Sequence, residues 1–166
     1  MNIFATDPDP KESARVLDNQ RLVKMVLETA QIMCSSLYVR GVSHTKLPYR
    51  PTHKSHPAIL WAAEHPGNLR WLYLHGKALS KEYARRYNKL HKSGEVILSL
   101  KGYTTALQHP PVSFYNGARH VGLGIDFTHL PVHEAYRQYL ITRWRIQKSP
   151  PRWTNRSPPD WVHYIV

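Results

Sequence analysis

The sequence is poor in cysteine, in acidic residues and in long apolar runs. Its single cysteine, Cys34, excludes an internal disulfide and fits a reducing cytoplasm. No apolar run is long enough to span a bilayer, and the N-terminus lacks the apolar core of a secretory signal. We therefore expect a soluble intracellular protein of one domain, residues 1–166, which is long enough to bury a hydrophobic core.

The shortage of acidic residues gives the chain a strong positive charge. Lysine and arginine number 23 against 11 acids, so the formal net charge is +12. This imbalance favours a polyanionic partner, nucleic acid first, over a merely solvated basic surface. The chain also has 5 Trp and 10 Tyr, some interleaved with basic residues in RWLYLHGKALSKEYARRYNK. These rings are suited either to stacking on unpaired bases or to ordinary core packing.

Residues 18–40 have the pattern of a central helix rather than of a surface helix. At about 100° per residue, one narrow stripe is polar and nearly all the remaining surface is apolar. That stripe contains Gln20, Arg21, Lys24, Glu28, Gln31 and Ser35. We interpret it as the wall of a cleft in which Glu28 is an active-site carboxylate. The alternative is a solvated stripe in which Lys24 and Glu28 form a weak i,i+4 pair.

The remaining pattern predicts a mostly α, compact single-domain bundle of about three long helices. These should span residues 18–40, 66–90 and 131–146, with shorter helices at Pro10 and over 58–64. Asp9 is placed to cap the helix that starts at Pro10, and Gly41 to end the central helix. The apolar start MNIF should be tucked into the core, and EVILSL fits either a helix or a strand. Long basic loops and an extended, proline-rich C-terminal tail complete the prediction.

Three segments between or after the helices supply candidate nucleic-acid contacts. The loop 42–57 is rich in His, Lys and Arg, and basic loops contact phosphates. Its histidines match no zinc spacing, so we expect no metal. The long segment 109–127 and the aromatic tail are the other two, although the tail's Trp153 and Trp161 could instead pin it to the helices. The candidate binding residues are Asn2, Gln31, Arg50, His53, Lys54, His56, Tyr115, Asn116, Arg119, Trp153, Asn155 and Arg156.

Several short motifs resemble the pyrimidine dimer DNA glycosylase family. LVKMVLE, from Leu22 to Glu28, aligns without a gap with the helix that carries the family's catalytic Glu. KSHPAILW resembles the family's N-H-P-x-L segment, EYARRYNK the end of its next helix, and PRWTNRSPPDW its aromatic C-terminus. The resemblance is concentrated in residues 1–90. It extends to small phage proteins that begin MNIF, and it implies a bacterial or phage-infected cytoplasm.

The resemblance implies a catalytic set with two departures from the family. Glu28 takes the place of the catalytic carboxylate, but Leu27 stands where the family has Arg, so Arg21 or Lys24 would have to supply that charge. The family's nucleophile is an N-terminal amine exposed after Met removal. Because Asn2 is too large for the usual removal of Met, the nucleophile here would be the amine of Met1, with Lys24 as the reserve.

The function expected from this resemblance is a DNA N-glycosylase, with possible abasic-site lyase activity and no cofactor. The amine would attack C1′ of a flipped nucleotide, and Glu28 would stabilise the cation and move protons. Three alternatives stay open at this point. They are an enzyme of the same fold acting on a free nucleotide or modified phage base, a non-catalytic nucleic-acid-binding protein, and a histidine-based metal nuclease.

Overall fold

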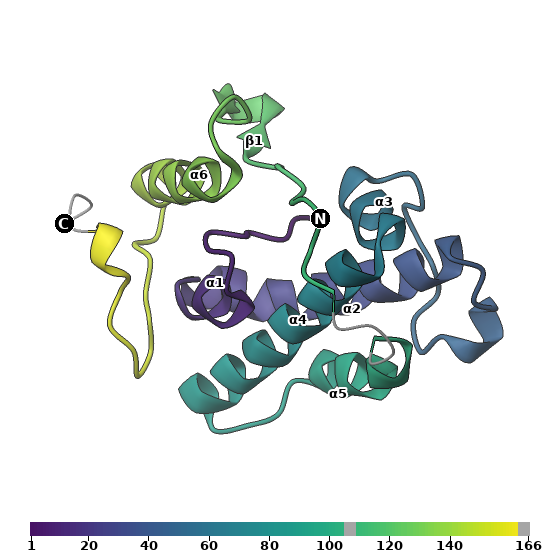
Figure 1. The fold of residues 1–166 in the computed structure, drawn as a ribbon. Helices are drawn as coiled ribbons and strands as arrows, with labels where there is room; N and C mark the ends of the chain where they lie inside the picture. Colours follow the sequence, from purple (N-terminus) through teal and green to yellow (C-terminus); the bar gives the residue numbers. More distant parts are fainter. Residues whose placement is uncertain (105–108, 163–166) are drawn as a thin grey trace.

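The computed structural model describes residues 1–104 and 109–162 and confirms the mostly α fold (Figure 1). Within those residues the α-helices are α1 (Pro10–Arg15), α2 (Asn19–Val39), α3 (Pro57–Glu64), α4 (Pro66–Tyr87), α5 (Lys92–Ser99) and α6 (Val132–Ile146). Short 3₁₀ turns lie at His44–Lys46, Leu100–Tyr103, Val121–Leu123 and Asp160–Val162. The strands β1 (Arg119–His120) and β2 (Ile125–Asp126) form a small antiparallel ribbon, with Arg119 opposite Asp126.

Helix α2 lies at the centre of the helical packing, as its pattern predicted. It packs against α3, α4 and α5, and α4 also packs along α1. A Cβ built on Gly76 of α4 would lie 2.8 Å from the Thr29 side chain and 3.0 Å from Ile97. Only glycine therefore lets α4 approach both α2 and α5 at this point.

The length and composition of α2 would also allow it to cross a membrane. In this structure most of that segment is buried against neighbouring helices, as in the core helix of a globular domain. Val23 and Leu27 are exceptions, since each is about 40% exposed (39% and 40%). The apolar surface of α2 is therefore less completely covered than the sequence pattern suggested.

The ends of the predicted helices are set by local chemistry. The carboxylate of Asp9 accepts a hydrogen bond from the backbone N–H of Lys11 and caps α1. Gly41 follows α2 with a φ of +94°, the left-handed conformation expected of it. Helix α4 ends at Tyr87, three residues before the predicted 90, because Asn88 adopts a left-handed conformation and closes the helix on Ala84.

The sequence left EVILSL open, and the structure places it in the helix α5 and the turn that follows. His91 caps α5 through its ring nitrogen, which accepts a hydrogen bond from the backbone of Ser93.

The structure also shows which role three aromatic residues of the stretch 70–89 have. Trp71, Tyr73 and Tyr83 are buried in the core, so they pack within the protein instead of offering stacking faces.

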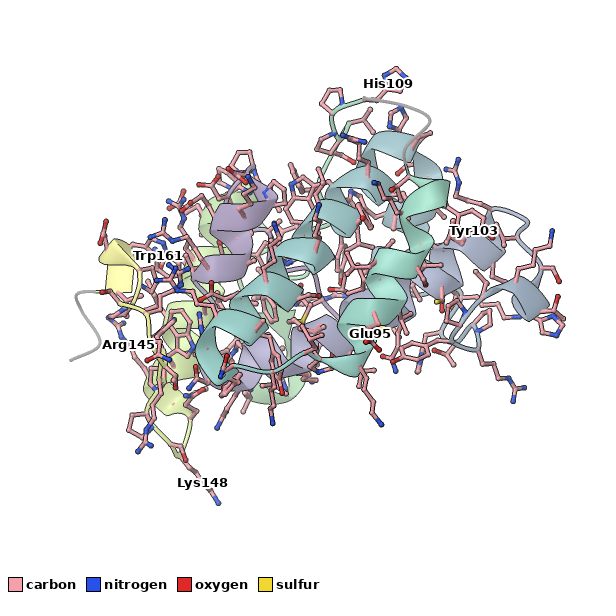
Figure 2. All side chains as sticks on the ribbon, turned by 90° about the horizontal axis from the view of Figure 1, so that it is seen from below. Glu95, Tyr103, His109, Arg145, Lys148 and Trp161 are labelled. Carbon is pink, nitrogen blue, oxygen red and sulfur yellow. The ribbon has the colours of Figure 1, made fainter. Side chains whose placement is uncertain are left out.

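The first residues and the part of the tail around Trp161 both pack against the helical body. Ile3, Phe4 and Ala5 are buried, which confirms that the apolar start is tucked into the core. In Figure 1 the N-terminus lies near the centre of the molecule, between α6 and α3. Figure 2 shows Trp161 beside α6 at one end of the molecule, where it stacks on Trp144 with 5.7 Å between ring centroids.

Candidate active site

A cavity of about 440 Å³ lies beside the N-terminal half of α2. Four segments that are distant in the sequence contribute to it: residues 1–4, α2, the β1 strand and α6. The cavity brings together the predicted catalytic residues Met1, Arg21, Lys24 and Glu28. Its other lining residues are Asn2, Phe4, Gln20, Met25, Arg119, His120, Tyr139 and Arg143.

Glu28 is the only acidic side chain among the described residues that line this cavity. Its side chain is 12% exposed, and one carboxylate oxygen lies 3.2 Å from the Nζ of Lys24. Lys24 is 72% exposed, so this ion pair is open to solvent on the lysine side. Such a half-exposed pair adds little stability, and Glu28 is left lining a ligand-sized space.

Arg21 is held away from Glu28 by partners of its own. Its Nη1 donates to the buried carboxylate of Asp18 at 2.8 Å and to the side chain of Gln147 at 3.1 Å. The same oxygen of Asp18 accepts a hydrogen bond from the indole N–H of Trp144. The side chain of Asp18 makes no capping hydrogen bond to α2, and its carboxylate compensates the charge that Arg21 brings to the cavity.

The electrostatic surroundings of His56 connect the N-terminal amine with Glu28. Burial lowers the pKa of His56, and the positive charges of the Met1 amine and of His53 lower it further. The carboxylate of Glu28 opposes those effects. Because one imidazole responds to both groups, the amine, Glu28 and His56 share one electrostatic neighbourhood. The ring of His56 is itself fixed, since its Nδ1 accepts from the Ala58 backbone and caps α3.

Asn2 determines where the amine of Met1 lies. Its side-chain N–H donates to the carbonyl of Gly117 at 3.0 Å, and its oxygen accepts from the backbone of Ile3 at 2.8 Å. The same oxygen also accepts from Phe4, whose φ is +42°. The amide of Asn2, predicted to contact nucleic acid, is thus largely engaged within the protein, where it anchors the first residues at the cavity wall.

Arg143, which the sequence pattern did not single out, carries a charge without a nearby acid in the cavity. Its Nη1 donates to the hydroxyl of Tyr139 at 2.9 Å, whereas its Nε is buried without a hydrogen-bond partner. No ion pair links Arg143 to an acid in the described part of the chain. Because Arg143 lines the cavity and forms no ion pair with an acid in residues 1–104 and 109–162, its guanidinium charge is available to an anionic ligand.

Arg119 and His120 extend from the small ribbon to the cavity mouth, where both side chains are exposed. Arg119 lies opposite Asp126 in the ribbon. Hydrogen bonds from Thr128 are the main cause of the lowered pKa of the Asp126 carboxyl, and the positive charge of Arg119 lowers that pKa further. Its candidate neighbours Tyr115 and Asn116 do not line the cavity. The Asn116 amide supports the loop through Thr128, Leu130 and Ala118.

The other predicted contacts on the 44–56 loop lie outside the cavity lining. Arg50, His53 and Lys54 are exposed, and the ammonium of Lys54 lies 4.6 Å from the ring centroid of Tyr38. Gln31 is half-buried one turn beyond Glu28 on α2. The strongly positive face predicted for this loop remains a prediction. Within residues 1–104 and 109–162, no three His, Cys, Asp or Glu side chains are placed to hold one metal ion.

The tail candidates are used in fixing the tail. The indole N–H of Trp153 donates to the carbonyl of Val16 at 2.9 Å, and its ring packs edge-on against Trp144. Arg156 forms a two-point ion pair with Glu82 of α4. The side chain of Asn155 lies 3.4 Å from the Arg86 carbonyl. None of these three lines the cavity that contains Glu28.

Fold and cavity together define a class: a basic, mostly helical protein whose first residue and one helix-borne glutamate line the same small cavity. The sequence model of one family, pyrimidine dimer DNA glycosylase, matches residues 1–93, more than half of the chain. The chain belongs to the pyrimidine dimer DNA glycosylase family. It is thereby related to enzymes that act on DNA. No curated protein and no solved structure matches it.

Proposed function

We propose that this protein is a DNA N-glycosylase with abasic-site lyase activity, acting in the cytoplasm on a damaged or modified base. The observation that carries the proposal is the convergence of Met1, Lys24 and Glu28 on one cavity in a chain of this family. Pyrimidine dimers are the substrate to try first, because the family is described by them.

The reaction starts with attack of the neutral Met1 amine on C1′ of the target nucleotide. The new N–C1′ bond replaces the bond from C1′ to the base, and the base leaves with the electron pair and takes up a proton. Glu28 accepts a proton from the attacking nitrogen and passes it to O4′, so that the sugar ring opens to a protonated Schiff base. Its negative charge also stabilises this cation.

The lyase step follows from the same intermediate. The iminium makes the C2′ proton acidic, and its loss expels the 3′ phosphate by cleavage of the C3′–O bond. Water then hydrolyses the imine and returns the amine of Met1. No redox partner is needed, since every step moves protons and electron pairs only.

Arg143 is assigned the role of holding a phosphate of the target strand. Its guanidinium lines the cavity and has no acidic partner among the described residues, and a phosphate oxygen is the matching partner for that charge. Arg119 is exposed at the mouth, where it can contact a neighbouring phosphate. This arrangement supplies from α6 and β1 the positive charge that Leu27 does not provide.

Borohydride reduction during incubation with a lesion-containing oligonucleotide tests the proposal. Hydride converts the Schiff base into a stable amine, so a covalent protein–DNA adduct is expected with damaged or abasic DNA and not with undamaged DNA. Acetylation of the N-terminus should abolish the adduct. Peptide mapping of the adduct should identify Met1.

Lys24 provides the matched control, because its ammonium also lies beside Glu28. Lys24→Ala should still give the adduct if Met1 is the nucleophile. An adduct that survives acetylation but is lost in Lys24→Ala would transfer the role to Lys24. Absence of any adduct or base release, with tight DNA binding retained, would reject the enzyme in favour of a binding protein.

A further inference from the structure

A second basic groove lies between α1 and α4, apart from the cavity that contains Glu28. It has a volume of about 700 Å³ and shares no lining residue with that cavity. Figure 1 shows α1 and α4 in front of α2, and these two helices, which pack against each other, supply most of the groove's lining residues. A neighbouring hollow of about 600 Å³ continues it beneath the C-terminal tail, and Arg15, Arg85 and Arg156 are among the residues lining both.

The lining of this groove, which we call the α1–α4 groove, is strongly biased toward positive charge. Its basic residues are Lys11, Arg15, Lys77, Lys81, Arg85 and Arg156, and its only acids among the described residues are Glu12 and Glu82. The excess of four positive charges is concentrated in a single groove. A purely solvated surface would gain nothing from gathering like charges that repel one another.

Both acids are already neutralised by arginines. Glu12 pairs with Arg15 at 3.1 Å, and Glu82 pairs with Arg86 and Arg156. Burial alone would raise the pKa of Glu82, but the hydrogen bonds from the two arginines outweigh it and hold that pKa below its usual value. Glu82 is therefore ionised and its charge is fully engaged at the floor of the groove.

Four cations are left in the groove without an acidic partner within residues 1–104 and 109–162: Lys11, Lys77, Lys81 and Arg85. Lys77, Lys81 and Arg85 follow one another at intervals of four residues on α4. At 1.5 Å per residue they form a row about 12 Å long on one side of the helix. Such a row matches a ligand whose negative charges repeat along a line.

The floor of the groove is apolar between these charges. Ala14 from α1 and Leu74 and Ala78 from α4 line it. Cations at the rim with small apolar side chains between them suit a phosphodiester backbone, because the phosphates meet the cations while the sugars lie on the floor. A small anion would need only one of the four cations.

From these observations we infer that the α1–α4 groove binds the backbone of a second nucleic-acid segment while the cavity at Glu28 engages the target strand. This inference rests on the proposed function for the choice of DNA as the polymer and for the target strand at Glu28. A protein with two separate backbone sites can hold two duplexes at once, or two distant parts of one molecule, and so can transfer between them without complete release.

Bridging of two duplexes tests this inference directly. Two undamaged duplexes with donor and acceptor fluorophores are mixed with the protein at low salt, and energy transfer is recorded as the protein is titrated. The test variant is the triple change Lys77→Gln, Lys81→Gln and Arg85→Gln. The matched control removes the same charge elsewhere, at the exposed Lys92, Lys101 and Lys148. Thermal melting verifies the fold of both.

The wild-type protein and the control triple variant should bridge the duplexes, and the test triple variant should not. The slope of log affinity against log salt should become shallower by about 2 to 3 in the test variant, since each lost phosphate contact accounts for about 0.9. An equal loss of energy transfer in both triple variants would show that bridging depends only on the overall positive charge, and it would overturn the inference. So would a wild-type protein that never bridges.

Two further readouts separate the outcomes. Borohydride trapping on a short lesion oligonucleotide reports the cavity at Glu28 and should be unaffected in the test variant. If trapping fails while bridging persists, the glycosylase proposal is rejected and the inference about the groove is retained.

As a competitor, polyglutamate should displace the second duplex less effectively than an oligonucleotide of equal charge. The reverse order would assign the groove to an acidic protein partner and refute the inference.

Discussion

Residues 1–93 and the remainder of the chain contribute different things to the same cavity. The first region matches the family and brings the amine of Met1, the carboxylate of Glu28 and the lysine beside it. The second lies beyond the match and contributes Arg119 and Arg143. The groups to which we assign the chemistry thus lie within the matched residues, whereas Arg119 and Arg143 come from the part of the chain beyond the match.

In our proposal, Arg143 supplies the positive charge that Leu27 does not provide. That residue stands where the resembling family has an arginine, and here it is 40% exposed on α2. The cavity nevertheless contains a guanidinium without an acidic partner in the described chain, because α6 brings Arg143 to it. A charge needed at a site is defined by its position in space, and a helix remote in sequence can supply it.

Of the substitutions that test this comparison, Glu28→Gln is expected to have the largest effect on activity. The change removes the negative charge and proton transfer but almost no volume, so base release should fall by about 10²- to 10⁴-fold while DNA binding persists. Single-turnover excision and a gel-shift measurement give both quantities. Glu95→Gln, on the exposed face of α5, is the matched control. Near-normal turnover in Glu28→Gln would show that residues 1–93 do not supply an essential carboxylate through Glu28.

Glu82→Gln tests the contact that ties the two regions together. Arg86 is fully buried against Glu82, and Arg156 of the tail joins the same carboxylate. Loss of that charge leaves a buried guanidinium uncompensated, so the free energy of unfolding should fall by about 3–5 kcal/mol. Urea denaturation measures it. Glu12→Gln, in an exposed pair, should cost less than about 1 kcal/mol. Equal costs would contradict the structural role.

His75 makes the first region sensitive to acid. Burial lowers the pKa of this histidine to about 4, although the hydrogen bond to the Pro10 carbonyl opposes the shift. The unfolded chain binds the proton near pH 6.5, so stability should be lost as the pH falls from 6.5 toward 4, by up to about 3 kcal/mol. Urea midpoints at several pH values should show this slope, and His75→Gln should flatten it. Loss of stability confined to pH below 4 would exclude His75 as the cause.

Arg143→Ala should have the smallest effect and reports on the second region. Loss of a charged hydrogen bond to phosphate costs about 1.5–3 kcal/mol, equivalent to a weakening of substrate binding by about tenfold or more. KM should rise more than kcat falls, and Arg143→Lys should recover part of the loss. Arg145→Ala on the same helix is the control. A pure loss of kcat would place Arg143 among the reacting groups.

Local sequence patterns were enough to predict the helices and to single out Glu28 as a candidate. The apolar surface of residues 19–39 and the polar stripe through Glu28 follow from helical periodicity, and capping at Asp9 and Gly41 follows from the chemistry of those residues. These features depend on neighbours within a few positions. The family resemblance then marked Glu28 and Met1, whose roles remain proposals.

Only the tertiary structure decided which distant residues meet. Arg143 lies 115 positions from Glu28, and no periodicity relates two helices separated by so much chain. The same holds for Trp153 and Arg156, which contact Val16 and Glu82, while their candidate role in binding stays a prediction. Each fragment of sequence permits many packings, and burial of the shared core selects the one in which α6, the small ribbon and the N-terminus enclose a single cavity.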